Sequence, residues 1–127
     1  MKLHLHTNQR QRLAKEMYLK AILQLSKEQA VVKQSDVVLC LGVSKSSVNE
    51  MVKKLADEKF IEEDTTTLSL TQKGEKFAII VLQKYTIIKE FLEKTLKLEN
   101  AHDEACNLEH AFSLEAVQKL DLFLKKK

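Results

Sequence analysis

The stretch S-D-V-V-L-C-L-G-V-S-K-S-S-V-N-E-M-V-K-K-L-A, residues 35–56, decides the predicted fold. Ser35 predicts the start of a short helix, because a serine side chain can accept a hydrogen bond from an otherwise free N–H group of the first turn. Gly42 suits the left-handed conformation that commonly ends a helix. Ser44 then predicts the start of a second helix. We therefore expect two helices joined by a tight turn.

The second predicted helix has one apolar and one polar side. Its apolar residues recur at i, i+3, i+4, i+7 and i+8, which is the spacing of a single buried helical face. They are Val48, Met51, Val52, Leu55 and Ala56. The polar side carries Lys45, Ser46, Ser47, Asn49, Glu50, Lys53 and Lys54. The helix is predicted to bury the first set and to leave the second free.

A β-hairpin is predicted directly after these helices. The β-prone runs 60–63 and 68–70 flank a polar turn at 64–67, and two such runs around a short polar segment are typical of a hairpin. A helix, a tight turn, a second helix and a hairpin follow one another in the winged helix-turn-helix fold. In this fold the second helix enters the major groove of DNA.

The polar side of the second helix therefore gives the candidate DNA contacts. Serines at a helix N-terminus, with the backbone N–H groups there, can bond phosphate oxygens, and lysines can neutralise phosphates. The candidate phosphate contacts are Ser44, Lys45, Ser46, Ser47, Lys53 and Lys54. Asn49 and Glu50 are candidates for contacts to base edges. The alternative is a plain helical hairpin with a solvated polar side.

The charge distribution fits DNA binding by the first half of the chain. The net charge is +3, but residues 1–59 hold 11 Lys and Arg against 6 Asp and Glu, whereas residues 60–127 hold 10 against 12. A basic first half joined to a slightly acidic second half is typical of a nucleic-acid-binding unit attached to another unit. A chance fluctuation in a lysine-rich chain is the alternative.

The rest of the chain predicts long helices, because it has no proline and only two glycines. The first helix should span 7–26, with Met17 and Ile22 on its apolar side. Thr71 should cap a long helix that reaches about Leu96. Asn100 and Ser113 should cap two further helices. The predicted fold is mainly α, with a winged helix-turn-helix domain at 1–73 and a helical domain at 74–127.

Several classes of protein are not expected. No apolar run approaches the roughly 20 residues of a membrane span, and the N-terminus lacks the apolar segment of a signal peptide. We therefore expect a cytoplasmic protein with no membrane partner, in which Cys40 and Cys106 are reduced thiols. We do not expect an enzyme, because no motif pairs a nucleophile with a base and no glycine-rich phosphate loop is present.

The segment A-H-D-E-A-C-N-L-E-H-A, residues 101–111, is a candidate metal site. On a helix, His102, Cys106, Glu109 and His110 would share one stripe, because residues three and four apart lie on one face. Thiolate, imidazole and carboxylate together suit Fe²⁺, Zn²⁺, Co²⁺ or Ni²⁺, with Mn²⁺ less favoured. The alternative is an exposed amphipathic helix whose His and Cys residues have no ligand.

Four stretches together resemble the iron- and manganese-dependent repressors, the family of the diphtheria toxin repressor and the manganese transport regulator. In chain order they are E-M-Y-L (16–19), L-G-V-S-K-S-S-V (41–48), L-T-Q-K-G (70–74) and H-D-E-A-C-N-L-E-H (102–110). The resemblance runs from about residue 10 to 124. It implies a homodimer that binds a palindromic operator in double-stranded DNA. It also implies that the second domain binds metal and dimerises, in a short, two-domain form.

The resemblance further implies a principal metal site made of Met17, Cys106, Glu109 and His110. Met and Cys are the choices of the iron-dependent members, whereas the manganese-dependent members have carboxylates at both places. Lys20 also stands where the manganese type offers a further carboxylate. The expected cofactor is therefore Fe²⁺, while Mn²⁺, Zn²⁺, Co²⁺ and Ni²⁺ stay open.

Two positions depart from the family pattern. Tyr85 stands where the family usually supplies a histidine to a second metal site, and Lys89 stands where a glutamate is frequent. Only His102 remains of that site, so we expect it to be lost or altered. The first expectation is a metal-dependent repressor of metal-homeostasis genes. The alternatives are a regulator of the same fold with lost or altered metal dependence, and a metal-handling dimer that does not bind DNA.

Overall fold

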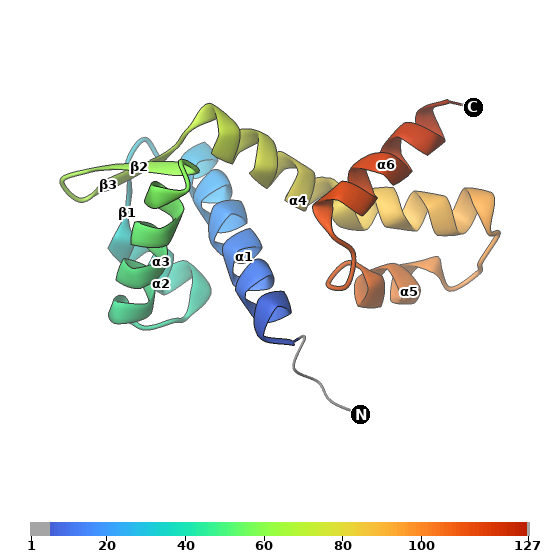
Figure 1. Ribbon diagram of the computed structural model, residues 1–127, viewed down its shortest axis with the longest axis horizontal. Coiled ribbons are helices and arrows are strands. Elements are labelled where there is room, and N and C mark those ends of the chain that lie inside the picture. Colours follow the sequence, from blue (N-terminus) through green and yellow to red (C-terminus); the bar gives the residue numbers. More distant parts are fainter. Residues whose placement is uncertain (1–5, 127) are drawn as a thin grey trace. The chain divides into compact units, whose positions relative to one another are not determined.

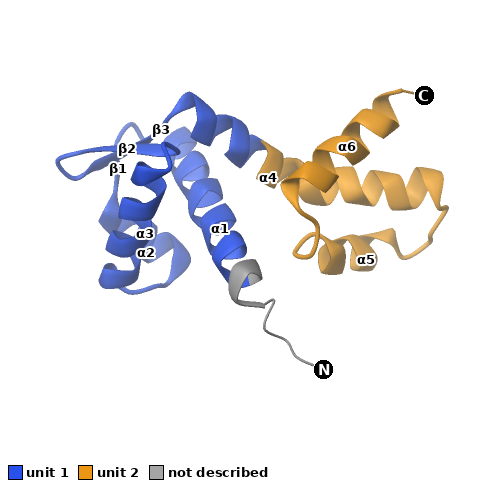
Figure 2. Ribbon diagram, in the orientation of Figure 1, with its two compact units in different colours: residues 1–79 blue, residues 80–127 orange. Residues whose placement is uncertain are grey.

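The computed structural model describes residues 6–126, and the side chains of residues 10–126. The chain divides into two compact units, residues 1–79 and 80–127 (Figure 2). The first unit contains α1 (His6–Glu28), β1 (Val32–Lys33), α2 (Gln34–Leu41), α3 (Lys45–Asp57), β2 (Ile61–Asp64), β3 (Thr67–Leu70) and the start of α4 (Gln72–Glu90). The second contains the rest of α4, a π-helical turn (Phe91–Thr95), α5 (Ala101–Leu108) and α6 (Leu114–Lys125). The predicted fold class is confirmed: the protein is mainly helical with one small antiparallel sheet.

The first unit has three helices packed with a three-stranded sheet (Figure 1). Strands β2 and β3 form the predicted hairpin, with Ile61 opposite Leu70. Strand β1 pairs with the other edge of β3, with Val32 opposite Leu68, and the sheet order is β1-β3-β2. Strand β1 was not predicted, because a strand of two residues shows no periodicity. The core side chains that are almost fully buried are Leu19, Ile22, Val37, Val48, Val52, Leu55 and Ile61.

The first helix of the helix-turn-helix begins two residues earlier than predicted. Helix α2 starts at Gln34, so Ser35 lies inside its first turn and the prediction of a cap at Ser35 was wrong. The carboxylate of Asp36 instead accepts a hydrogen bond from the backbone N–H of Lys33, 2.8 Å away. An Asp in the first turn is favourable here because it also complements the positive end of the helix dipole.

The turn and the second helix form as predicted. Gly42 ends α2 with φ 66° and ψ 36°, a left-handed conformation that glycine adopts without steric cost. Ser44 caps α3, since its Oγ accepts a hydrogen bond from the N–H of Ser47 over 3.1 Å. Val48, Val52 and Leu55 are completely buried, so the predicted apolar side faces the core.

The start of α4 packs closely against the segment that follows α3. Thr71 caps α4 as predicted, because its Oγ1 accepts a hydrogen bond from the N–H of Gly74 over 3.0 Å. The same hydroxyl lies 2.6 Å from the carbonyl oxygen of Lys59, to which it donates. A Cβ atom at Gly74 would stand 1.9 Å from the carbonyl oxygen of Phe60. Only glycine therefore allows this close approach of two backbones.

The second unit has its own apolar core. The buried side chains that form it are Ile87, Ile88, Leu92, Ala101, Ala105 and Val117. Ser113 caps α6 as predicted, with its Oγ 3.1 Å from the N–H of Ala116. Asn100 is the residue that precedes α5, as predicted, but its side chain makes no capping hydrogen bond. In the described part of the chain, no helix is both long and apolar enough to cross a bilayer.

Candidate DNA and metal sites

The polar side of α3 is the candidate DNA surface, and all of its predicted residues are exposed. They are Ser44, Lys45, Ser46, Ser47, Asn49, Glu50, Lys53 and Lys54. The serines form a hydrogen-bonded cluster, in which Ser44 Oγ lies 2.9 Å from Ser47 Oγ and 3.3 Å from Ser46 Oγ. Because the apolar side of the same helix is buried, the polar side has a fixed orientation in the first unit.

Gln34 is a residue of this surface that the sequence did not reveal. Its side-chain amide donates a hydrogen bond of 2.8 Å to the carboxylate of Glu63 on β2. The same nitrogen makes a longer contact of 3.5 Å with Oδ1 of Asn49 on α3. Gln34 thereby connects α3 with the β2–β3 hairpin. No motif could have indicated this role, because the three residues are far apart in the sequence.

Met17 lies on α1, which packs against α3. Its side chain is 52% exposed, although the periodicity of α1 placed it on the apolar side together with Ile22. The buried side of α1 is centred instead on Tyr18, Leu19 and Ile22. An exposed thioether on a rigid helix is free to act as a soft metal ligand, whereas a core methionine would not be.

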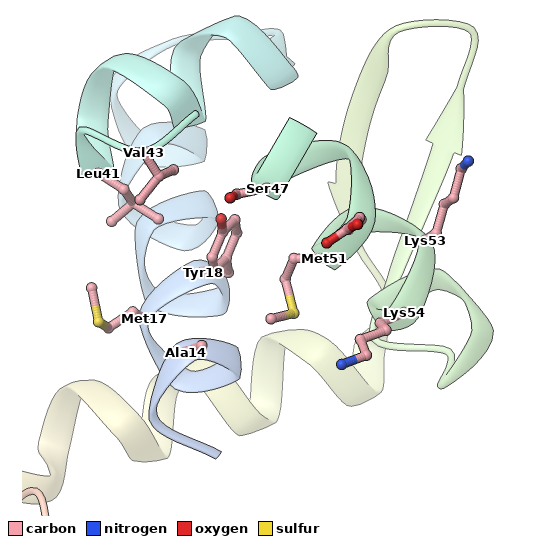
Figure 3. Close-up of a pocket in the computed structure, with 10 residues that line it drawn as sticks. Ala14, Met17, Tyr18, Leu41, Val43, Ser47, Met51, Lys53 and Lys54 are labelled. Carbon is pink, nitrogen blue, oxygen red and sulfur yellow. The ribbon is translucent and has the colours of Figure 1, made fainter. Parts of the chain in front are cut away.

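A cavity of about 580 Å³ adjoins Met17 (Figure 3). Figure 3 shows Met51 extending from α3 toward α1, with Tyr18 between the two helices. The lining residues come from α1, from the end of α2 and the turn after it, and from α3, and they are Ala14, Met17, Tyr18, Leu41, Val43, Ser47, Glu50, Met51, Lys53 and Lys54. Met17 and four of the candidate DNA contacts therefore border one space, and these contacts are Ser47, Glu50, Lys53 and Lys54.

Burial also acts on Tyr18, which is only 6% exposed. Removal of the phenol from water disfavours its charged form and raises the pKa of Tyr18 above the ordinary value of 10.0. The hydroxyl of Tyr18 is thus neutral throughout the physiological range.

The other predicted metal ligands lie at the C-terminal end of α5 in the second unit. Cys106 is an exposed free thiol on α5. The helix ends at Leu108, so Glu109 and His110 lie in the turn beyond it rather than on one continuous helical stripe. Glu109 retains helical geometry, because its N–H donates to the carbonyl of Ala105 over 2.9 Å. Glu109 is half-buried and His110 is exposed.

The donor chemistry fits a divalent transition metal, although the described part of the chain holds no preformed cluster. Cys106, Glu109 and His110 offer sulfur, oxygen and nitrogen donors within five residues of sequence, and the thioether of Met17 would add a soft sulfur. Among the described residues, no three His, Cys, Asp or Glu side chains converge closely enough to hold an ion. Cys106, Glu109 and His110 are therefore compatible with a metal in their chemistry, but they do not converge around one.

His102 has other partners than the predicted ligands Glu109 and His110. Its Nδ1 lies 2.5 Å from the hydroxyl of Tyr85 on α4, and its Nε2 lies 3.8 Å from the sulfur of Cys106. The rings of Tyr85 and His102 meet edge to face, with centroids 5.6 Å apart. The ammonium group of Lys89 forms an ion pair of 3.3 Å with Glu93. Tyr85 and Lys89, the two departures from the family pattern, thus each interact with another side chain of the protein.

Both halves of the chain match known families. The family model of the iron dependent repressor N-terminal DNA binding domain matches residues 13–65, and that of the iron dependent repressor metal binding and dimerisation domain matches residues 71–127. The chain belongs to the iron-dependent repressor family. Members of this family are DNA-binding, metal-dependent transcriptional repressors and not enzymes.

Individual relatives agree with this family. An uncharacterised HTH-type transcriptional regulator of Methanocaldococcus jannaschii is 36% identical over 115 residues, which cover 87% of this chain and 92% of that protein. The HTH-type transcriptional regulator MntR of Bacillus subtilis is 30% identical over 107 residues, which cover 83% of this chain and 75% of that protein.

Solved structures also resemble the chain. The structure of ScaR with bound Zn²⁺ has a TM-score of 0.69 and 32% sequence identity, and the manganese regulator SloR has a TM-score of 0.60 and 35% identity. Each match covers 89% of this chain and 54% of the solved chain. The chain therefore spans about half the length of these two solved proteins.

Proposed function

We propose that this family member is an Fe²⁺-responsive repressor that binds a palindromic DNA operator as a homodimer and controls metal-homeostasis genes. The observation that carries the proposal is the exposed thioether of Met17, which borders the same cavity as the recognition helix α3. A ligand bound to this sulfur would act directly beside the DNA surface.

On the DNA side, the proposed contacts are the exposed polar residues of α3. Ser44, Ser46 and Ser47 surround the N-terminus of α3, where backbone N–H groups favour a phosphate. Lys45 and Lys53 would neutralise further phosphates. Asn49 and Glu50 would contact base edges, because an asparagine can make two hydrogen bonds to adenine and a carboxylate can accept from cytosine.

On the metal side, we infer a principal site of Met17, Cys106, Glu109 and His110. The matching family model is named for iron, whereas one similar solved structure is a manganese regulator, so the choice of metal rests on the chemistry of the donors in this chain. Thioether and thiolate are softer donors than the carboxylates that suit Mn²⁺. This chemistry supports Fe²⁺, with Co²⁺ as a chemically stable substitute.

The donors of this site come from α1 and from the end of α5. A bound ion would supply the positive charge that holds both sets of donors together. Met17 would then fix α1 relative to residues 106–110, and the population would shift toward the dimer that is competent to bind DNA. Coupling of this kind is typically worth about 5–150-fold in affinity.

Fluorescence anisotropy on operator DNA tests the proposal with Fe²⁺, Mn²⁺, Zn²⁺ and chelator in parallel. We expect Fe²⁺ or Co²⁺ to tighten operator binding at least about fivefold relative to chelator. The double variant Cys106→Ala, His110→Ala should lose this gain and keep its thermal unfolding temperature. The matched control is Cys40→Ala, which removes the other exposed thiol. A double variant that responds to metal like the parent would place the site elsewhere.

A salt series in the same assay distinguishes DNA binding from incidental charge attraction. The logarithm of the affinity should fall linearly with the logarithm of salt concentration, with a slope of about −0.9 for each phosphate contact. Lys53→Ala should make the slope shallower by about one contact, and Lys94→Ala in the second unit should leave it unchanged.

A second candidate function is a regulator of the same fold whose metal dependence is lost or altered. The hydrogen bond between Tyr85 and His102 favours it, because a protein group then satisfies a histidine that the family uses for metal. Equal operator affinity in Fe²⁺ and in chelator would support this candidate over the first.

A further inference from the structure

The geometry points to a positioning role for Tyr85 and His102 toward the thiolate of Cys106. We propose that Tyr85 fixes the tautomer of His102, and that His102 in turn donates an N–H to the sulfur that binds metal. This inference rests on the proposed function, because it assumes that Cys106 is a metal ligand. It assigns His102 to the support of the principal site and not to a second metal site.

Three side chains form a continuous series of contacts within the second unit. The hydroxyl of Tyr85, on α4, lies 2.5 Å from Nδ1 of His102. The other ring nitrogen, Nε2, lies 3.8 Å from the sulfur of Cys106, one helical turn further along α5. The edge-to-face contact of the two rings restricts rotation of the imidazole. Both nitrogens of His102 are therefore directed at protein atoms.

The protonation of these groups follows from the chemistry of a metal-bound thiolate. Such a thiolate has no proton and can only accept a hydrogen bond. A neutral imidazole carries one N–H, so this N–H must be on Nε2 when Cys106 is a ligand. The Nδ1 atom is then an acceptor, and the hydroxyl of Tyr85 is the donor within reach. Tyr85 thereby selects the tautomer that Cys106 requires.

The support of metal ligands by outer hydrogen bonds has a known magnitude. Loss of such an outer partner typically weakens metal binding about 10–100-fold, because the ligand is no longer held in orientation. In this chain the first ligand at the end of α5 is an exposed cysteine, whose side chain would otherwise rotate freely. The contact with His102 gives its sulfur a preferred position before an ion arrives.

The surroundings disfavour the other reading, in which Tyr85 and His102 bind a second ion. Lys89 lies one helical turn beyond Tyr85 on α4, and its ammonium group is paired with Glu93 3.3 Å away. The carboxylate of Glu93 is thereby engaged, and the positive charge of Lys89 opposes a second cation nearby. This placement agrees with a hydrogen-bonded tyrosine rather than a metal-bound phenolate.

Titration of the full-length protein with Co²⁺ tests the inference, with the thiolate-to-cobalt absorption band as the readout. The parent should bind Co²⁺ with this band, and Tyr85→Phe should weaken binding about 10–100-fold and shift the band. The matched control is Thr95→Val, which also removes one hydroxyl from the second unit. The Thr95 hydroxyl is buried without a hydrogen-bond partner in the described structure, so this change should leave both affinity and band unaltered.

Two variants of His102 test the same inference without a change at Tyr85. His102→Gln keeps an N–H that can reach Cys106, whereas His102→Leu removes it. We expect Gln to retain much of the affinity and Leu to lose it. Addition of Tyr85→Phe to His102→Gln should cost little more, because an amide has no tautomer to select. This pair keeps the test decisive even if Tyr85→Phe folds poorly.

Nuclear magnetic resonance provides a direct readout of the tautomer. Two-bond ¹H–¹⁵N correlations are recorded for the metal-free protein and for the Zn²⁺-loaded protein. They should show the His102 proton on Nε2 in the Zn²⁺-loaded form. A proton on Nδ1 in the loaded form would overturn the inference.

The outcomes separate this inference from the proposed function. If Tyr85→Phe binds Co²⁺ like the parent, with an unchanged band, the positioning role is wrong and the metal site stands. If Tyr85→Phe lowers the number of bound ions from two to one, Tyr85 is a ligand and the inference is also wrong. If the parent shows no thiolate band and Cys106→Ala binds Co²⁺ equally well, the proposed site fails and the positioning role fails with it.

Discussion

Helices α3 and α5 are both short and amphipathic, but α3 is held in place by a side-chain cap and by larger buried side chains than α5. Helix α3 has a side-chain cap at Ser44 and three completely buried apolar residues, Val48, Val52 and Leu55. Helix α5 has no side-chain cap, and its fully buried side consists of two alanines. The larger apolar contact of α3 stabilises a fixed orientation of its polar side.

This difference affects how each helix would bind its proposed partner, which is DNA for α3 and a metal ion for the end of α5. The polar side of α3, the candidate DNA surface, lies on one regular helix, so its orientation within the first unit needs no ligand. The proposed donors Cys106, Glu109 and His110 straddle the end of α5, and they do not converge into a metal-binding cluster in the described part of the chain. A preformed candidate surface for DNA in one unit, together with a candidate metal site in the other whose donors do not yet converge, is what a switch requires, because the ligand must change a structure in order to signal.

The substitution with the largest expected effect is Gly74→Ala, which disrupts the packing between α4 and the segment that follows α3. Gly74→Ala places a Cβ 1.9 Å from the carbonyl oxygen of Phe60. A backbone must then move, and we expect a loss of about 3 kcal/mol or more in the free energy of unfolding. Urea unfolding followed by circular dichroism measures it.

Gly42 offers the control for this substitution. It has a positive φ of 66° but open space around its Cβ position, so Gly42→Ala should cost only about 1 kcal/mol of backbone strain. Equal losses for the two glycine variants would contradict the close contact at Gly74.

A smaller effect would sharpen the difference between the two helix starts. Ser44→Ala removes the hydrogen bond from Ser47 N–H and should destabilise the protein by about 1 kcal/mol. Asn100→Ala removes a side chain that makes no capping hydrogen bond and should cost less than about 0.5 kcal/mol. The same urea experiment compares them. A larger loss for Asn100→Ala than for Ser44→Ala would contradict this difference in capping.

The smallest effect concerns the alkaline stability of the first unit. Burial raises the pKa of Tyr18 above 10.0, so the folded state holds this proton more tightly than the unfolded state. The stability contribution is constant below pH 10.0 and falls as the pH rises through the folded-state pKa. Ultraviolet titration of Tyr85→Phe isolates Tyr18, because the chain has two tyrosines. A midpoint at or below 10.0 would contradict the burial.

The sequence revealed the elements whose signals are local. Ser44 and Gly42 marked the turn, and the spacing of Val48, Val52 and Leu55 marked the buried side of α3, because a cap and a helical period depend on neighbours within a few residues. The hairpin was predicted for the same reason. The elements that carry the candidate DNA surface were therefore predicted from the residues alone.

Features that depend on distant contacts were predicted less well. Met17 has an apolar side chain in a periodic helix, yet Tyr18 and Leu19 form the buried side of α1 and Met17 is exposed. Which side of the helix is buried depends on its packing against the rest of the unit. The helical stripe through Glu109 and His110 assumed a longer α5 than the one that forms. The contact of Tyr85 with His102 joins two helices, and the residue spacing within either helix does not indicate it.

Gln34 has a consequence for how this repressor could acquire new operators. One amide nitrogen is shared between Asn49, a proposed base contact, and Glu63 of the hairpin. Replacement of Gln34 would release both side chains without altering any residue of the recognition helix. Changes in operator preference could therefore arise by mutation outside the residues that touch bases. A comparison of related regulators that counts only base-contacting positions would overlook such divergence.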